Sequence, residues 1–301
     1  MEKFRSGFVS LIGKTNSGKS TLLNSLVGEK VAITTYKTQT TRTAIRAIIN
    51  RENSQIILTD TPGIHKGKSK LSKIMVDTAY TILEEVDGIL FLVDGTEKSV
   101  SQENQAILEK IKQMKKPTIL VINKTDLLPR EKVLQTIEQY QKEYDFASII
   151  PVSALKKEGM ETVLKEIEKI LPEGPKYYEE DMYTDQTMRS MVEEVIREKA
   201  LKLLNEEIPH GILVEVQKFE SKTTHQGEPF YHIEAIIYCV RESHKGIIIG
   251  KGGEMLKKIA TFARQDLEKM FMQKVNLRTW VKVKEDWINS ETIVSQKFKL
   301  K

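Results

Sequence analysis

The stretch of sequence that decides the fold is Gly13-Lys14-Thr15-Asn16-Ser17-Gly18-Lys19-Ser20. It follows the apolar run Phe8–Gly13 and precedes Ser20–Val27, which has helical spacing, so a strand, a glycine-rich loop and a helix succeed one another. Glycines let consecutive backbone N–H groups turn inward, and the positive end of the following helix adds to their field. The stretch therefore predicts a loop that binds nucleotide phosphates, in preference to a glycine-rich turn that binds nothing.

Two side chains of this loop have predicted chemistry of their own. Lys19 is placed to neutralise the β and γ phosphates, and Ser20 offers a hydroxyl ligand for Mg²⁺. Further contacts with the nucleotide are expected from Asn16, Ser17, Gly18 and Thr21. Because such a loop recognises only phosphate, the base has to be recognised elsewhere in the sequence.

The first half of the chain has the pattern of a P-loop domain. From residue 8 to residue 171, short apolar runs alternate with helical segments, which predicts an α/β fold with a mostly parallel sheet and helices on both faces. The expected strands are Phe8–Gly13, Ala44–Asn50, Gln55–Thr59, Gly88–Val93, Thr118–Asn123 and Ser148–Val152. The expected helices are Ser20–Val27, Val100–Lys115, Glu131–Tyr144 and Met160–Leu171.

The tetrapeptide Asn123-Lys124-Thr125-Asp126, at the end of an expected strand, predicts recognition of guanine. The Asp126 carboxylate can accept hydrogen bonds from both the ring N–H and the exocyclic amine of guanine, a donor pair that adenine lacks. In isolation the tetrapeptide is a common solvated turn, but here it follows a phosphate loop. The residues expected to contact the base are Asn123, Lys124 and Asp126, together with Ser153 and Ala154 after the last strand.

These motifs resemble those of P-loop GTPases. The resemblance implies that Asp60 of Asp60-Thr61-Pro62-Gly63 holds Mg²⁺ through water, that the Gly63 N–H contacts the γ-phosphate, and that Gly63–Met75 is the second switch. It also implies a threonine that closes over Mg²⁺ from the loop before the second strand. We assign that role to Thr41, with Thr40 as the next choice. Lys19, Thr41 and Gly63 are then the residues expected to act on the transferred phosphate.

Two positions bear on the rate of hydrolysis. Ile64 stands where many GTPases have a glutamine that orients the attacking water, and an alkyl side chain cannot do this, so slow intrinsic hydrolysis is predicted. Asn16 stands where GTPases with a hydrophobic residue at that place often use an asparagine near K⁺. A bound K⁺ that supplies positive charge is therefore a hypothesis, and the alternative is that Asn16 only shapes the loop.

Length and composition predict two domains. The chain has 301 residues, 30% of them charged, and a net charge of +5. We expect a GTPase domain at 1–172, a linker at 173–182, where Pro172, Gly174 and Pro175 fall close together, and a smaller domain at 183–301. Cys239 is the only cysteine, and no apolar run is long enough for a membrane span. A monomer in the cytoplasm is expected.

The second half predicts an α+β domain built around Gly250-Lys251-Gly252-Gly253. The expected helices are Asp185–Leu204, Ser243–Ile249 and Glu254–Met270, and the expected strands are Ile212–Phe219, Tyr231–Val240 and Val275–Lys284. This order, with a GxxG sequence between two helices, matches the type II KH topology, which clamps single-stranded RNA. The expected RNA contacts are Ile249, Gly250, Lys251, Gly252, Gly253, Lys257, Lys258 and Arg264, with Ile248 and Ile249 as core or as a platform for bases.

Three alternatives to RNA binding by a GTPase stay open from the residues alone. The GxxG segment can be a helix hairpin with a solvated basic face. The basic domain can instead meet anionic lipid headgroups, as in a membrane-associated signalling switch. An ATP-dependent RNA remodeller is the third, and Asn123 and Asp126 argue against it.

The whole chain resembles the Era family of GTPases. The matching segments are Lys19–Asn24, Gln39–Arg42, Asp60–Gly63, Ile196–Lys199, Ile249–Gly253 and Trp280–Lys284. The resemblance implies an enzyme that hydrolyses GTP to GDP, binds the 3′ end of 16S rRNA in its GTP form through the KH domain, and assists assembly of the small ribosomal subunit. It also implies peripheral association with the inner face of the cell membrane. The chain departs from the family after Trp287, where an arginine- and leucine-rich helix is usual.

Overall fold

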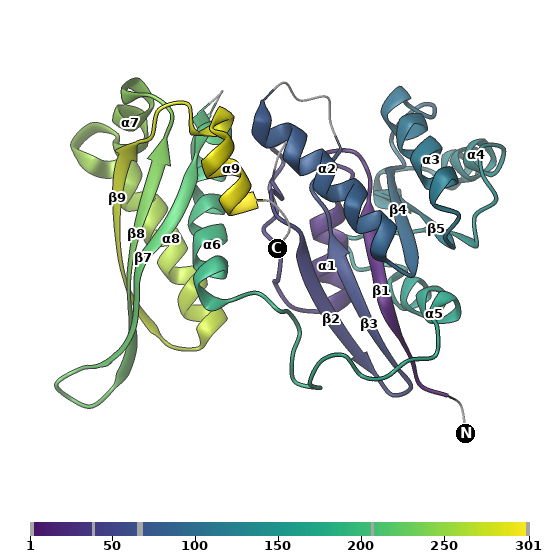
Figure 1. Ribbon diagram of the computed structural model, residues 1–301, viewed down its shortest axis with the longest axis horizontal. Coiled ribbons are helices and arrows are strands. Elements are labelled where there is room, and N and C mark those ends of the chain that lie inside the picture. The colour runs from purple at the N-terminus through teal and green to yellow at the C-terminus, as the bar shows by residue number, and fades with distance from the viewer. Residues whose placement is uncertain (1–2, 38–39, 65–68, 206–207, 299–301) are drawn as a thin grey trace. The chain divides into compact units, whose positions relative to one another are not determined.

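The computed structural model describes residues 3–37, 40–64, 69–205 and 208–298 (Figure 1). The chain folds into two compact units whose division falls between Asp185 and Gln186. The first unit is a sheet covered by helices on both faces, and the second is a smaller sheet with helices. Each unit has its own hydrophobic core, as expected for two domains.

The first unit contains a six-stranded sheet in the order β2-β3-β1-β4-β5-β6. All neighbouring strands are parallel except the edge strand β2, which runs antiparallel to β3. The strands are β1 (Arg5–Ile12), β2 (Ile45–Arg51), β3 (Ser54–Asp60), β4 (Gly88–Asp94), β5 (Thr118–Asn123) and β6 (Ser148–Pro151). The helices are α1 (Lys19–Val27), α2 (Lys70–Glu85), α3 (Gln102–Met114), α4 (Arg130–Gln141) and α5 (Met160–Ile170).

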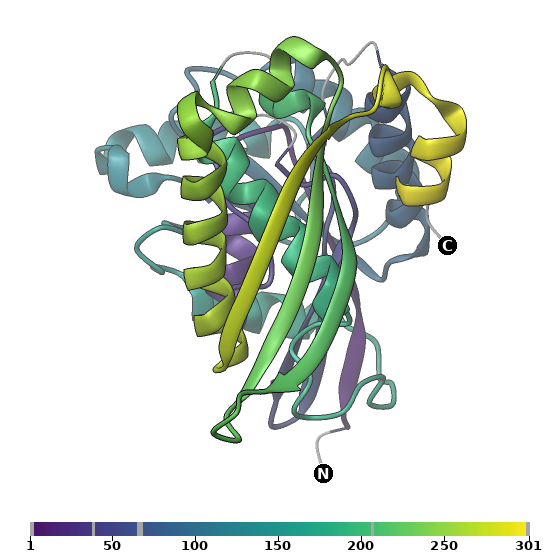
Figure 2. The same ribbon diagram turned by 90° about the vertical axis from the view of Figure 1, so that its left-hand side faces the viewer.

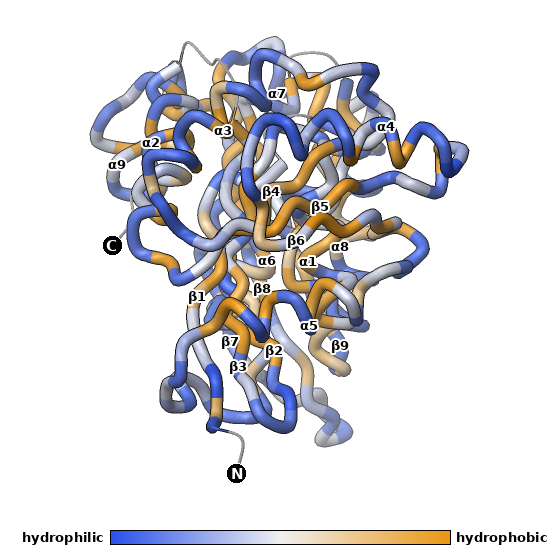
Figure 3. Tube along the Cα trace, turned by 90° about the vertical axis from the view of Figure 1, so that its right-hand side faces the viewer, coloured by the Kyte–Doolittle hydropathy of each residue, from blue (hydrophilic) through white to orange (hydrophobic). Residues whose placement is uncertain are grey.

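The two faces of this sheet bury different clusters. Because successive side chains of a strand point to opposite faces, Leu11 of β1 packs in the cluster that holds α1 and α5, whereas Ile12 packs in the cluster that holds α2, α3 and Tyr140 of α4. The central strands β4 and β5 are hydrophobic along most of their length, as Figure 3 shows in orange, because both faces are covered. The predicted P-loop α/β fold is confirmed.

One helix of this unit was not expected from the sequence. Helix α2 begins after Ser69, whose hydroxyl accepts a hydrogen bond from the Ser72 N–H at 3.1 Å, and its first residues, Lys70–Met75, form the last part of the predicted second switch. Helix α3 begins at Gln102, two residues later than expected, because Ser101 is its N-cap and accepts a hydrogen bond from the Asn104 N–H at 3.4 Å. The other expected elements differ only at their ends.

The segment predicted as a linker, 173–182, lies against the sheet of the first unit. The Gln55 side-chain carbonyl accepts hydrogen bonds from the backbone N–H groups of Tyr177 and Tyr178, at 2.7 and 3.0 Å. The Ser6 hydroxyl donates to the Pro175 carbonyl at 2.6 Å. These bonds explain why the first unit continues to Asp185.

The second unit has the predicted type II KH order of elements. Its helices are α6 (Met188–Leu203), α7 (Glu242–Ile249), α8 (Glu254–Phe271) and α9 (Glu291–Phe298), and its strands are β7 (Leu213–Thr223), β8 (Pro229–Cys239) and β9 (Lys274–Val283). The sheet order is β7-β8-β9, antiparallel between β7 and β8 and parallel between β8 and β9. Figure 2 shows β9 as the gold strand next to the long helix α8. Ile233, Ala235 and Ile237 of β8 pack against α6 and α8.

None of the helices described here has the length and apolar character that crossing a membrane requires.

Candidate functional site

The phosphate loop lies between β1 and α1 and approaches neighbouring segments too closely for side chains. A Cβ at Gly13 would lie 2.3 Å from the Leu92 carbonyl oxygen. A Cβ at Gly18, where φ is +101°, would lie 2.2 Å from the Asn123 side-chain nitrogen. The two glycines are therefore required by contacts with β4 and β5 as well as by the turn itself.

Lys19 is buried at the start of α1. Its ammonium group donates hydrogen bonds to the carbonyls of Gly13 and Lys14, both at 3.0 Å. Burial lowers the pKa of Lys19 to about 8, and the charge of Asp60 partly opposes that change. An ammonium desolvated in this way is stabilised by a polyanion placed beside it, which fits the predicted contact with the β and γ phosphates.

Ser20, Thr41 and Asp60 converge next to Lys19. Asp60 Oδ2 accepts hydrogen bonds from Ser20 Oγ at 2.7 Å and from Thr41 Oγ1 at 3.0 Å, and the two hydroxyl oxygens lie 2.9 Å apart. Thr40 Oγ1 instead donates to the Lys37 carbonyl at 2.7 Å. The structure thus brings Thr41, and not Thr40, to the predicted metal ligands.

The donor set around Asp60 fits Mg²⁺. Among the described residues, Asp60 Oδ1 is buried and has no hydrogen-bond partner. Burial raises the pKa of Asp60, while Lys19, Ser20 and Thr41 favour the ionised form. A hard divalent cation would satisfy this oxygen and keep the carboxylate ionised, and Mg²⁺ at phosphate sites typically uses only one or two carboxylates.

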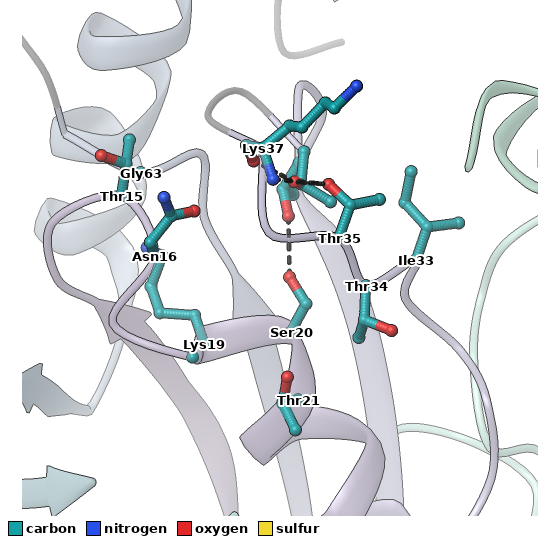
Figure 4. A pocket seen from close by; sticks show the side chains of 13 residues that line it. Thr15, Asn16, Lys19, Ser20, Thr21, Ile33, Thr34, Thr35, Lys37 and Gly63 are labelled. Carbon is teal, nitrogen blue, oxygen red and sulfur yellow. Dashed lines mark hydrogen bonds between the residues drawn. The ribbon is translucent and has the colours of Figure 1, made fainter. Parts of the chain in front are cut away.

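Most of the predicted phosphate and magnesium residues line one pocket together with the loop before β2 (Figure 4), whereas Ser17 and Asp60 are fully buried and do not line it. Figure 4 shows Asn16, Lys19 and Ser20 on the phosphate loop and α1, with Thr35 and Lys37 on the facing loop. Four further residues of this loop, which were not predicted from the sequence, also line the pocket: Ile33, Thr34, Thr35 and Lys37. Asn24 anchors its start, because the Asn24 side chain accepts hydrogen bonds from the N–H groups of Val31 and Ala32, at 3.0 and 2.9 Å.

The predicted guanine-binding residues lie at the ends of β5 and β6. The side-chain amide of Asn123 donates to the Ser17 carbonyl at 2.9 Å and accepts from the Ala154 N–H at 3.0 Å. The Asp126 carboxylate accepts from Ser153 Oγ at 2.7 Å. Asn123 therefore joins three predicted motifs, namely the phosphate loop, its own NKxD sequence and the Ser153-Ala154 loop.

Asp94 and Glu97 support this site and were not predicted. Asp94 Oδ2 lies 2.5 Å from Lys124 Nζ, and hydrogen bonds from Lys124 and Thr96 hold the pKa of Asp94 below its usual value although burial opposes this. Glu97 forms an ion pair with Lys14 of the phosphate loop. Asp94 is the last residue of β4 and Glu97 follows three residues later, so both acids lie at the carboxyl end of this strand, and this position is the signal that could have revealed them.

Gly63 and Ile64 lie beside the phosphate loop. A Cβ at Gly63 would lie 2.9 Å from Thr15 Cγ2 and 3.2 Å from Lys19 Nζ, so the backbone there is next to the predicted γ-phosphate position. Ile64 pairs with Lys14 through a β-bridge, and its side chain packs against the hydrophobic cluster of α2 and α3. The residues 65–68 of the predicted second switch lie outside the described residues, as do Gln39 and Lys299–Lys301.

The predicted RNA loop joins α7 to α8. Gly250 has φ +74°, and a Cβ there would lie 2.8 Å from Met255 Cβ, so α8 packs too closely for a side chain at Gly250. A Cβ at Gly252 would point into open space. Lys251, Lys257 and Lys258 are exposed, and none of the three forms an ion pair in the described part of the chain.

The other predicted RNA residues differ in their surroundings. Ile248 is fully buried in the core and Ile249 is partly buried, whereas Ile247, which was not predicted, is 52% exposed beside the loop. Arg264 forms hydrogen bonds with both carboxylate oxygens of Glu268, at 2.9 and 3.0 Å. Arg264 is also about 15 Å along α8 from Glu254, since a helix rises about 1.5 Å per residue. The structure does not bring Arg264 to the loop.

Comparison with known proteins matches each half of the chain to a known domain family. A family model described as a 50S ribosome-binding GTPase matches residues 8–124, and one described as a KH domain matches residues 207–288. GTPase Era of Clostridium novyi is 51% identical over 293 residues, which cover 97% of this chain and 98% of that protein. The chain belongs to the Era GTPase family. GTPase Era of Caldanaerobacter subterraneus subsp. tengcongensis is similar to it at 48% identity over 97% of this chain and 96% of that protein.

Solved Era structures share the fold over the full length. A variant of Aquifex aeolicus Era bound to GDP·AlF4⁻ has a TM-score of 0.93 at 39% identity, covering 99% of this chain and 100% of that one. Era in complex with MgGDPNP and nucleotides 1506–1542 of 16S ribosomal RNA has a TM-score of 0.93 at 40% identity, with the same coverage. Membership of the Era family confirms the predicted GTPase, its guanine nucleotide and its Mg²⁺.

Proposed function

We propose that this chain is a GTP-controlled RNA-binding factor that, in its GTP form, binds the 3′ end of 16S rRNA through its KH unit and assists assembly of the small ribosomal subunit. The observation that carries the proposal is the GxxG loop Gly250–Gly253 of a KH fold, which is open to solvent at Gly252 and has exposed lysines in the loop (Lys251) and on the helix that follows it (Lys257 and Lys258). The Era relative that is 40% identical over 99% of this chain was solved with MgGDPNP and nucleotides 1506–1542 of 16S ribosomal RNA.

The loop suits the backbone of a single strand. Its residues have positive φ at Gly250, Gly252 and Gly253, and the N-terminus of the 18-residue helix α8 follows directly. Backbone N–H groups and the positive helix end can then face the sugar-phosphate chain, while Lys251 and Lys257 add attraction that does not depend on sequence. The GTPase family model names the 50S subunit, but the relatives that match both units are the better guide to the partner.

Hydrolysis of GTP to GDP and phosphate would be the timer of this switch. Lys19 would neutralise charge on the β and γ phosphates, and the Gly63 N–H would bind a γ-phosphate oxygen. Ser20, Thr41 and Asp60 would hold Mg²⁺, which supplies positive charge to the phosphate oxygens. The partly buried Ile64 side chain packs against the hydrophobic cluster of α2 and α3, and an alkyl group can neither orient nor activate the attacking water. Hydrolysis by the chain alone should therefore be slow.

The decisive experiment measures binding of a single-stranded RNA with the 16S 3′-end sequence to the full chain, with GDPNP or with GDP. We expect tighter binding with GDPNP, and loss of binding in Gly252→Asp. The matched control is Gly227→Asp, because Gly227 also has positive φ, +82°, and open space around its Cβ, but lies in the β7–β8 hairpin. Equal, weak binding of all three proteins in both nucleotide states would refute the proposal.

The cytoplasm is the compartment we propose, because rRNA is the proposed partner. Peripheral association with the inner face of the cell membrane stays a prediction, as do the monomeric state and the role of Arg264. Sedimentation with vesicles of anionic lipid tests the membrane prediction, and the Gly252→Asp protein is the control. Lipid binding should not depend on Gly252, whereas RNA binding should.

A further inference from the structure

Strand β9 presents a row of exposed side chains on the sheet face opposite the helices of the KH unit. Val275 and Val281 point into the core, and the alternate positions are exposed. The exposed residues are Lys274, Asn276, Arg278, Trp280 and Lys282, which we call the β9 stripe. β9 is an edge strand of the sheet and pairs with β8 alone (Figure 2).

The two tryptophans of the chain have contrasting surroundings. Trp287 is fully buried, and its indole N–H donates to the Gly211 carbonyl at 2.9 Å. Trp280 is 45% exposed, and within the described residues its indole N–H has no hydrogen-bond partner. A tryptophan left exposed with an unpaired N–H is typical of a surface that binds a partner.

The cations of the stripe are unpaired, unlike those on the rest of the same face. Lys218 and Lys222 of β7 are paired with Glu220, at 3.1 and 3.3 Å, and Lys284 lies 3.7 Å from Glu215. Over the described residues, no ion pair involves Lys274, Arg278 or Lys282. The register neighbour Glu234 is the acidic group next to Arg278, and it is bonded to His232 at 3.1 Å. The stripe therefore attracts anions.

The geometry points to a second RNA surface: we propose that the β9 stripe binds single-stranded RNA that extends beyond the GxxG loop, with a base stacked on Trp280 and phosphates on Lys274, Arg278 and Lys282. A strand rises about 3.3 Å per residue, so the three cations, which are four residues apart, recur about every 13 Å along β9. Arg278 and Lys282 lie on either side of Trp280, about 6.7 Å away along the strand. A stacking platform within a basic track is the general means of binding single strands. Lysines alone could serve to protect an edge strand from pairing, but an exposed indole does not serve that purpose.

This inference rests on the proposed function, because it concerns the same RNA. A GxxG loop clamps about four nucleotides. The Era relative was solved with nucleotides 1506–1542, a much longer segment. If this chain also binds a long segment, most of the RNA must contact surfaces outside the loop, and the β9 stripe is an unpaired basic surface in the same unit.

The test uses the full chain with GDPNP and a series of single-stranded RNAs from the 16S 3′ end, lengthened from four to about twelve nucleotides. Wild type should bind more tightly as the RNA lengthens. Trp280→Ala should weaken binding of the longest RNA by roughly tenfold and leave the tetranucleotide unchanged, whereas Trp280→Phe should keep most of the affinity. Lys222→Ala is the control on the same sheet. Replacing Lys274 and Lys282 together should lower the slope of log affinity against log salt for the longest RNA by about 1.4.

Fluorescence provides an independent readout, because the chain has only two tryptophans and one of them is buried. Acrylamide should quench Trp280 in the free protein and with the tetranucleotide, and the longest RNA should protect it. The Trp280→Phe protein, which retains only Trp287, should show little change.

Four results would overturn the inference. If wild type binds RNA but Trp280→Ala stays within about twofold at every length, stacking on Trp280 is wrong and the proposed function stands. An equal loss for the tetranucleotide would place Trp280 in the loop site. Protection of Trp280 by inorganic polyphosphate as strong as by RNA would show a purely ionic surface. Absence of RNA binding by wild type at any length, with no effect of Gly252→Asp, would refute the proposed function itself.

Discussion

The side-chain amide of Asn123 donates a hydrogen bond to the backbone carbonyl of Ser17, 106 residues earlier in the chain, at 2.9 Å. The same side chain accepts from the Ala154 N–H at 3.0 Å. Asn123 is buried, so both bonds are shielded from water. The amide thus fixes the phosphate loop relative to the loops that are predicted to recognise guanine.

Asn123→Ala should therefore weaken binding of GDP and GTP together. Loss of a buried bridging amide costs about 1–3 kcal/mol, which is roughly a 5- to 150-fold rise in Kd. Fluorescence titration with a labelled guanine nucleotide measures this. Asn50→Ala is the matched control, because Asn50 also bridges two segments, from Gln55 to the Glu180 carbonyl, but away from the nucleotide. Equal Kd values for the two variants would contradict the role of Asn123.

Asp126→Asn should change the preferred base from guanine to xanthine. The carboxylate accepts from the guanine amine, while an amide can donate to the carbonyl that xanthine has at the same place. We expect the affinity for GDP to fall roughly 100-fold and the affinity for xanthosine diphosphate to rise. Since an asparagine oxygen can still accept the Ser153 hydrogen bond, the fold should be unchanged. Competition between GDP and xanthosine diphosphate for the variant measures this change. An unchanged preference for GDP would show that the base is recognised by residues other than Asp126.

Thr41→Ala should raise the Mg²⁺ concentration needed for GTP hydrolysis, because Thr41 Oγ1 bonds the Asp60 carboxylate and lies 2.9 Å from Ser20 Oγ. Thr40→Ala is the control, since Thr40 bonds Lys37 instead. Hydrolysis rates over a Mg²⁺ titration measure the effect. The assignment is wrong if Thr40→Ala shifts the Mg²⁺ midpoint and Thr41→Ala does not.

Ile64→Ala should leave kcat within about twofold of wild type, because an alkyl side chain neither orients nor activates water. Its packing against the α2–α3 cluster makes the change destabilising instead, by about 1–2 kcal/mol for a partly buried side chain. Chemical denaturation and single-turnover hydrolysis of GTP separate these two effects. A tenfold fall in kcat with unchanged stability would show that Ile64 takes part in hydrolysis.

Potassium should accelerate hydrolysis relative to sodium in wild type if a monovalent cation near Asn16 supplies positive charge to the phosphates. Asn16 has φ +64°, which glycine adopts readily, so Asn16→Gly removes the carboxamide while it keeps the loop conformation. We expect the potassium effect to disappear in Asn16→Gly. Identical rates in the two salts for wild type would leave Asn16 only its role in loop shape.

The sequence by itself determined the chemistry and the order of the elements. Three stretches each combine local geometry with functional groups within a few residues: Gly13–Ser20, Asn123–Asp126 and Gly250–Gly253. The strand period depends on neighbours two positions away, and the helix period on neighbours three or four positions away. These features can therefore be recognised from the sequence alone. The two-domain α/β and KH architecture, the guanine nucleotide and Mg²⁺ could all be predicted in this way.

Tertiary structure decided the choices between equivalent residues. Thr40 and Thr41 are alike in sequence, and only the crossing of the loop over α1 brings Thr41 to Ser20 and Asp60. Trp280 and Trp287 are likewise equal in hydrophobicity, but one lies on the open face of an edge strand and the other is buried against Gly211. Burial, ion pairing and hydrogen bonds between distant segments depend on how strands pair and pack, and no local pattern encodes that pairing.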